Sequence, residues 1–178
     1  MTLADLASIA SVISGGAVLI SLVYLSLQTR QNTKHTMALI QQGRTNQITD
    51  RLGAMTSDLS LVDTVMRGSA GDQTMEDVQA ARYVLMTYAS FYNFEDQFYQ
   101  HREGLLDDAR NLGGIKAIAA ALRNPGTRAA WTIMRDRLDP GFQKYMDEIA
   151  AATPVAPARN LGGIWKSVVA GEVSKAST

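Results

Sequence analysis

The sequence predicts an all-α protein in which an N-terminal transmembrane helix continues into a small antiparallel helical bundle. Two observations predict this fold. Residues 6–29 contain no charged side chain, and a helix of that length can cross the roughly 30 Å of hydrocarbon in a bilayer. Beyond residue 58, apolar residues recur at helical spacing, and no segment shows a convincing strand pattern.

Composition narrows the classes of function. The chain of 178 residues carries 17 basic and 17 acidic side chains, so its formal net charge is zero. Nucleic-acid binding needs excess positive charge, so we expect no nucleic-acid partner. The chain has no Cys and only two His. Disulfides, thiolate catalysis and Cys- or His-rich metal sites are therefore excluded, and we expect no cofactor.

The predicted membrane anchor, residues 6–29, is bounded by Asp5 and Arg30. Tyr24 lies near one end, where an aromatic ring with a polar tip suits the membrane interface. Two alternatives compete with this interpretation. A cleaved signal peptide needs a basic start and a small-residue cleavage site, and the only charge before the apolar run is acidic. A buried helix of a soluble protein seldom runs this long without charge.

The flanks of the anchor predict its orientation. Arg30, Lys34 and Arg44 follow the anchor, and no acidic residue occurs between Asp5 and Asp50. Because positively charged flanks stay in the cytoplasm, we expect the N-terminus outside and residues 30–178 inside.

One face of the anchor is made of small residues. At 100° per residue, a narrow stripe holds Ala4, Ser8, Ser11, Gly15 and Ser26. Ser11 and Gly15 have the small-xxx-small spacing that lets two helix backbones approach closely. We interpret the stripe as a helix-packing face in the membrane; the alternative is that such residues are simply common in membrane helices.

After the anchor we expect three further parts, at residues 30–57, 58–152 and 153–178. The first is a juxtamembrane helix continuous with the anchor, because no Pro or Gly interrupts residues 17–42. The second is the bundle, which begins with a short helix at 59–67. Asp58 is its expected N-cap, and the run Gly68-Ser69-Ala70-Gly71 is expected to end it.

The longest helix of the bundle is expected at residues 75–104, with Thr74 as N-cap and Gly104 closing it. Its predicted buried stripe is Val84, Phe91, Phe98 and Leu105, with Tyr88 and Phe94 between them. A helix through Ile115, Ile118, Ala119 and Leu122 follows. Asn124-Pro125 and Asp139-Pro140 each predict a cap followed by Pro at the first helical position. The apolar faces of these last two helices are Trp131, Met134 and Leu138, and then Phe142, Tyr145, Met146 and Ile149.

The last part, residues 153–178, combines a Pro/Ala-rich linker with a short amphipathic helix. Its apolar residues are Leu161, Ile164, Trp165, Val168 and Val169, flanked by Arg159, Lys166 and Lys175. This helix is expected to dock on the bundle or on a partner; lying on the membrane surface or remaining disordered are the alternatives. Residues 109–115 recur identically as 158–164; the flanking residues differ, so this is not a repeat architecture.

Three stretches of the chain resemble a family of uncharacterised bacterial single-pass membrane proteins, a domain of unknown function, over roughly residues 1–150. The stretches are Ser21-Leu22-Val23-Tyr24-Leu25 with Gln28 and Arg30-Gln31-Asn32-Thr33; Phe94-Glu95 with Tyr99-Gln100 and Gly104-Leu105-Leu106-Asp107; and Asn124-Pro125-Gly126-Thr127-Arg128 with Trp131. Relatives often have Trp where this chain has Leu112-Gly113-Gly114. The resemblance implies an anchored helical domain in the bacterial inner membrane and no activity.

No catalytic constellation emerges from the ionisable residues. The acidic cluster of Glu95, Asp96, Glu103, Asp107 and Asp108 fits a solvated face better than a di-iron site, because Glu95 and His101 fall on different helix faces. His101 fits a hydrogen-bonded boundary residue better than a catalytic base. Gly113-Gly114 lacks the spacing of a phosphate loop.

One polar helical face is the exception, and it holds Tyr88, Tyr92, Glu95, Tyr99 and Arg102. It could line a ligand pocket, although a second packing face is the favoured interpretation. The sequence thus favours a membrane-tethered protein-interaction module, either an accessory subunit of a larger membrane complex or a homo-oligomer. The lipid bilayer and another membrane protein, or a second copy, would be its partners. A membrane-anchored ligand-sensing domain is the alternative, and an enzyme is a distant third.

Overall fold

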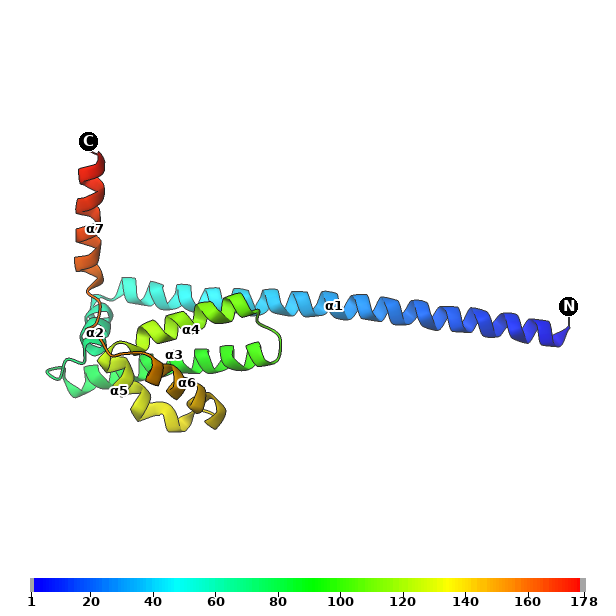
Figure 1. The fold of residues 1–178 in the computed structure, drawn as a ribbon, viewed down its shortest axis with the longest axis horizontal. Coiled ribbons are helices and arrows are strands. Elements are labelled where there is room, and N and C mark those ends of the chain that lie inside the picture. The colour runs from blue at the N-terminus through cyan, green and yellow to red at the C-terminus, as the bar shows by residue number, and fades with distance from the viewer. Residues whose placement is uncertain (1, 177–178) are drawn as a thin grey trace. The chain divides into compact units, whose positions relative to one another are not determined.

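The computed structural model describes residues 2–176; these form helices joined by short loops and contain no strand. The all-α prediction is confirmed. The helices are α1 (Leu3–Ser57), α2 (Leu59–Ala70), α3 (Asp77–Arg102), α4 (Asp108–Leu122), α5 (Pro125–Met134), the 3-10 turn η1 (Arg135–Arg137), α6 (Pro140–Ala152) and α7 (Leu161–Ala176) (Figure 1). The chain divides into two compact units, one up to Asp50 and one from Arg51 onward.

Helix α1 is unbroken over 55 residues, about 80 Å at 1.5 Å per residue. It contains a stretch long and apolar enough to cross a membrane. The large apolar side chains of that stretch are all exposed, Leu19 and Tyr24 by 66% and 65%. The hydroxyls of Ser21 and Thr29 donate to the carbonyls of Ala17 and Leu25, each at 2.8 Å. These polar side chains therefore complete their hydrogen bonds within the helix, as a membrane-spanning segment requires.

The turn from α1 to α2 is set by Asp58, whose side chain accepts a hydrogen bond from the Ser60 N–H at 2.9 Å. The predicted cap is confirmed. The predicted end of this helix at residue 67 was wrong, because α2 continues through Gly68 to Ala70. It ends where Gly71 adopts φ 71, a left-handed conformation that glycine takes without steric cost.

The start of α3 also differs from prediction. Thr74 is not its N-cap; the helix begins at Asp77, and the preceding residue makes no side-chain capping bond. Thr74 instead belongs to the α2–α3 loop, where its N–H and Oγ1 donate to Asp72 at 2.8 and 2.7 Å. The Thr74 hydroxyl has the largest effect on the Asp72 carboxylate, and Arg67 Nε also donates to this carboxylate at 2.7 Å. Together with the Thr74 N–H, these donors lower the pKa of Asp72 to about 2. At the other end, Gly104 has φ 72 just beyond the helix, as predicted.

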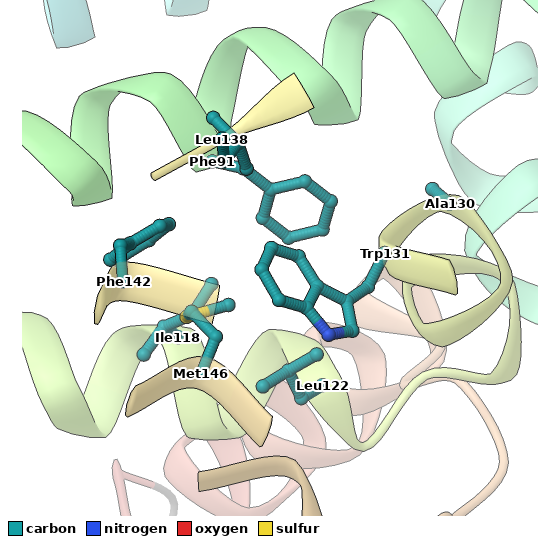
Figure 2. Packing of buried hydrophobic residues seen from close by; sticks show 8 residues of the cluster. All are labelled: Phe91, Ile118, Leu122, Ala130, Trp131, Leu138, Phe142 and Met146. Atoms are coloured by element: carbon teal, nitrogen blue, oxygen red, sulfur yellow. The ribbon is translucent and has the colours of Figure 1, made fainter. Parts of the chain in front are cut away.

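The core of the bundle is an aromatic cluster between α3, α4, α5 and α6 (Figure 2). The rings of Phe91 and Trp131 meet edge to face with centroids 5.1 Å apart, and Trp131 meets Phe142 at 6.1 Å. Edge-to-face pairs of this kind add to the energy of simple burial. The remaining buried members of the cluster are Ile118, Leu122, Ala130, Leu138 and Met146.

The predicted heptad stripe of α3 was only partly right. Phe91 is fully buried, but Phe98 and Val84 are only partly buried. The buried side chains of α3 are Tyr83, Thr87 and Phe91, each four residues apart. A strict seven-residue period drifts around a straight helix of 3.6 residues per turn, so Val84 and Phe98 pack at the margin of the core and only Phe91 lies inside it.

The later helices begin as predicted. Asp139 caps α6 by accepting from the Gly141 and Phe142 N–H groups at 2.7 and 3.3 Å. Asn124 precedes α5 and Pro125 opens it, but Asn124 makes no side-chain capping bond. Leu138 is buried, although it lies after η1 rather than on α5.

Arg128 joins the C-terminal ends of two helices. Its Nε donates to the Leu122 carbonyl of α4 at 2.7 Å, and its Nη2 donates to the Ala150 carbonyl of α6 at 2.8 Å and also to the Thr153 carbonyl. The last carbonyls of a helix have no partner within the helix, so one guanidinium satisfies such groups on both helices.

Helices α2, α3 and α5 cross at a point that only glycine allows. A Cβ on Gly126 would lie 1.7 Å from the Gly68 carbonyl oxygen, and one on Gly68 would lie 2.2 Å from the Tyr83 ring. Real Cβ atoms cannot approach this closely, so the two glycines set the spacing of these helices.

We expect Phe91→Ala to lower the free energy of unfolding by about 3–5 kcal/mol, because it leaves a cavity in the aromatic cluster. Phe98→Ala should cost less, about 1–2 kcal/mol, because its ring is only partly removed from water. Urea titration of the full chain in detergent micelles would measure both, with Trp131 fluorescence as the probe in a Trp165→Phe background. Equal losses for the two variants would show that the α3 register is wrong.

Candidate functional site

The polar face of α3 is used to hold the start of α6. Glu95 Oε1 accepts from the backbone N–H of Asp139 at 2.6 Å, and the Tyr99 hydroxyl donates to the Asp139 carboxylate. That hydrogen bond lowers the pKa of Asp139 and raises the pKa of Tyr99. Asp139 therefore links α3 to the α6 cap through two separate groups.

The rest of this face forms ring contacts rather than the lining of a cavity. Tyr88 and Tyr92 meet edge to face with centroids 5.3 Å apart. The Arg102 guanidinium lies 5.8 Å from the Tyr99 ring centroid and 5.5 Å from that of Phe98. All five predicted residues lie on α3, but the cavities described in this section are lined by other residues.

The acidic cluster has local partners. His101 Nε2 and Asp108 Oδ1 are 2.9 Å apart, and Asp107 caps α4 by accepting from the Arg110 N–H at 2.9 Å. Within residues 2–176, no group of three or more His, Asp or Glu side chains is placed to hold a metal ion.

The stripe of small residues lies on α1 as expected from its spacing, and Ala4, Ser8, Ser11 and Gly15 are all exposed. A Cβ on Gly15 would meet no atom within 4 Å. The structure thus leaves this face open to a neighbouring helix.

The C-terminal segment forms α7, and its apolar residues are exposed except Val169, which is half-buried. Leu161, Trp165 and Val168 expose 71%, 65% and 57% of their surface, and Ile164 exposes 38%. Asn160 precedes the helix and accepts from the Gly163 N–H at 3.0 Å.

The two copies of the repeated segment occupy different environments. Residues 109–115 lie within α4, whereas the helix of the second copy begins only at Leu161. The buried α4 residues Ile118 and Leu122 correspond to Ser167 and Gly171. Helix α7 therefore lacks the side chains that anchor α4 in the core.

Two pockets that lie between helices of the bundle were not predicted from the sequence. The smaller, about 10 Å³, lies beside Phe94, Phe98 and Ile118 and has room for no more than about one water. The larger, about 160 Å³, lies among α2, α3, α4 and α5, with Arg51 at its edge. On α3 its lining includes Tyr83, Thr87 and Ser90, and this hydroxyl-rich face beside Phe91 was the sequence signal that could have indicated it.

Neither a protein-family model, nor a curated protein, nor a solved structure matches this chain.

The Asp139 contacts predict an acid-sensitive step in stability. Because the pKa of Asp139 is lowered from its ordinary 3.8, its contribution to the free energy of unfolding is complete above about pH 5 and is lost as the pH falls through the lowered pKa. Tyr99→Phe removes the main cause of that shift. This variant should have a lower free energy of unfolding at neutral pH. The difference in that free energy between neutral pH and about pH 3 should also be smaller than in the natural chain.

Urea unfolding at the two pH values would measure this effect, with Tyr92→Phe as the matched control on the same helix face. If Tyr99→Phe and Tyr92→Phe leave the same pH dependence, the Tyr99–Asp139 bond does not stabilise the fold.

Proposed function

We propose that the chain is a membrane-tethered helical interaction module, in which α1 crosses a bilayer and carries the helical bundle. One observation carries this proposal: residues 6–29 of α1 have no charged side chain, and their large apolar side chains are exposed. Exposed apolar surface on this scale is unfavourable in water. Lipid would cover it, and residues 6–29 extend about 36 Å, enough for the hydrocarbon core.

The alternatives fit α1 less well. A cleaved signal peptide would end soon after its apolar run, whereas α1 continues as one helix to Ser57. A core helix of a soluble protein would be buried, whereas none of the apolar window is.

The orientation and the membrane are part of the proposal. Arg30, Lys34 and Arg44 lie on the C-terminal side of the span, which favours a cytoplasmic bundle and an external N-terminus. The resemblance to bacterial single-pass membrane proteins of unknown function supports the bacterial inner membrane as the location.

Two exposed surfaces support an interaction role. The first is the small-residue stripe of α1, to which another membrane helix could pack closely. The second is the apolar face of α7, which contains Trp165, a residue type enriched at binding hot spots. The partner would be another membrane protein or a second copy of the chain. No catalytic role is proposed, because the polar side chains of α3 bind Asp139.

The orientation predicts the behaviour of reporters fused after Thr178. A reporter active only in the cytoplasm should be active there, and a reporter active only in the periplasm should not. Replacing Arg30, Lys34 and Arg44 with Gln should weaken the preference for a cytoplasmic C-terminus, because those positive charges set the orientation. The opposite reporter pattern in the natural chain would contradict the proposed orientation.

The stripe predicts which substitutions weaken association in the membrane. Gly15→Ile places a branched side chain where a partner backbone would come closest, while preserving the hydrophobicity of the span. We expect it to reduce the signal in a transmembrane two-hybrid assay several-fold, and Ser11→Ile to do the same.

Gly16→Ile is the matched control, because Gly16 lies about 100° away from Gly15 around the helix. A Cβ there also meets no atom within 4 Å. If Gly15→Ile and Ser11→Ile associate as strongly as Gly16→Ile, the stripe is not the contact surface.

A further inference from the structure

The cavity of about 160 Å³ among α2, α3, α4 and α5 is lined by both apolar and hydroxyl-bearing side chains. Phe91 and Ile118, two of the core residues in Figure 2, form part of its apolar wall together with Val65 and Ala121. Its volume of about 160 Å³ is close to that of an engineered cavity of about 150 Å³ in another protein that binds benzene. The cavity is therefore large enough for one compact organic group.

Five hydroxyl-bearing side chains line the same cavity: Ser69, Tyr83, Thr87, Ser90 and Thr127. Three of them form a chain in which the Tyr83 hydroxyl lies 3.0 Å from Thr127 Oγ1 and donates to Ser69 Oγ at 3.4 Å. In the described part of the chain, Ser69 Oγ accepts this bond and donates none. The cavity thus offers hydroxyl donors to a polar group that enters it.

In the part of the chain that the structure describes, the only charge on the cavity lining is positive. Arg51 contributes a guanidinium, and no Asp or Glu lines the cavity. Nη1 of Arg51 donates to Ser90 Oγ, which in turn donates to the Met86 carbonyl at 3.2 Å. Among residues 2–176, no ion pair joins Arg51 to a carboxylate. Since an arginine has five N–H donors, most of its binding capacity is unused.

We propose that this cavity binds a small organic monocarboxylate. Its carboxylate would accept from the Arg51 guanidinium beside Ser90, and its apolar body would lie against Phe91 and Ile118. Guanidinium and carboxylate form strong, charge-assisted hydrogen bonds. A neutral molecule of the same shape would lose these bonds, and a water-filled cavity would leave the apolar wall without a partner.

Such a ligand would connect separate elements of the bundle. Arg51 belongs to the last turns of α1, whereas Ser69 lies on α2, Ser90 on α3 and Thr127 on α5. Bound ligand would therefore stabilise the attachment of residues 51–57 to the helices that follow. This site is distinct from the Tyr88–Arg102 face of α3, and it does not depend on the membrane proposal.

Benzoate is a suitable probe, with benzyl alcohol as its neutral analogue of similar size. Isothermal titration of the full chain in dodecyl maltoside micelles should show saturable binding of benzoate, with empty micelles as the blank. Benzyl alcohol should bind at least about tenfold more weakly, because it lacks the charge that Arg51 recognises.

Two variants test the site. Arg51→Met should weaken benzoate at least about tenfold; Arg51 is exposed, so its loss should leave the bundle folded. Ala121→Leu should abolish binding by filling the cavity from its apolar wall. Arg159→Met, which removes an exposed arginine from the linker, should bind benzoate as the natural chain does.

Absence of saturable benzoate binding by the natural chain would overturn the proposal. So would equal binding by the natural chain, Arg51→Met and Ala121→Leu, since that result would place benzoate outside this cavity. Near-UV circular dichroism of each variant separates loss of binding from loss of fold.

Discussion

The exposed, uncharged surface of α1 is the constraint on which the remaining structure depends. Residues 6–29 carry many large apolar side chains, and within the described chain nothing buries them. In lipid this arrangement is stable only if every polar group of the segment is satisfied internally. The hydroxyls of Ser21 and Thr29 contribute to this by donating to carbonyls of the preceding turn. Because the helix then continues to Ser57, the bundle must be stable through contacts of its own.

The bundle obtains that stability from a small set of specific contacts. The rings of Phe91, Trp131 and Phe142 fill its centre, and Trp131 also donates from Nε1 to Asp147 at 2.9 Å. Gly68 and Gly126 let α2 and α5 approach closely, and Arg128 satisfies the last carbonyls of α4 and α6. A domain of this size has little stability to spare, so these few contacts matter more than they would in a larger protein.

The sequence could predict features that depend on local chemistry. The caps at Asp58 and Asp139 and the left-handed residue at Gly104 follow from residue type and short spacing, and the structure confirms them. Features that depend on competition between neighbouring residues were harder to predict from the sequence. Thr74 has the composition of an N-cap, but Asp72 binds it in the loop, and no spacing rule distinguishes the two outcomes.

The candidate site was less predictable than the fold. The cavity is assembled from residues between Arg51 and Thr127 that are distant along the chain, so only the packed bundle brings them together. The polar face of α3, which the sequence favoured as a second packing face and left open as a pocket, contacts the Asp139 turn through Glu95. An isolated helix cannot show which of its polar faces will meet another element.

Alkaline carbonate extraction of membranes from cells expressing the chain tests the central claim most directly. Two charges at the middle of the span should each oppose insertion by about 2.5–3.5 kcal/mol. The natural chain should remain in the membrane pellet, and the double variant Leu19→Arg, Leu22→Arg should be released into the supernatant. Release of the natural chain, or equal retention of both chains, would contradict the account that α1 crosses the bilayer.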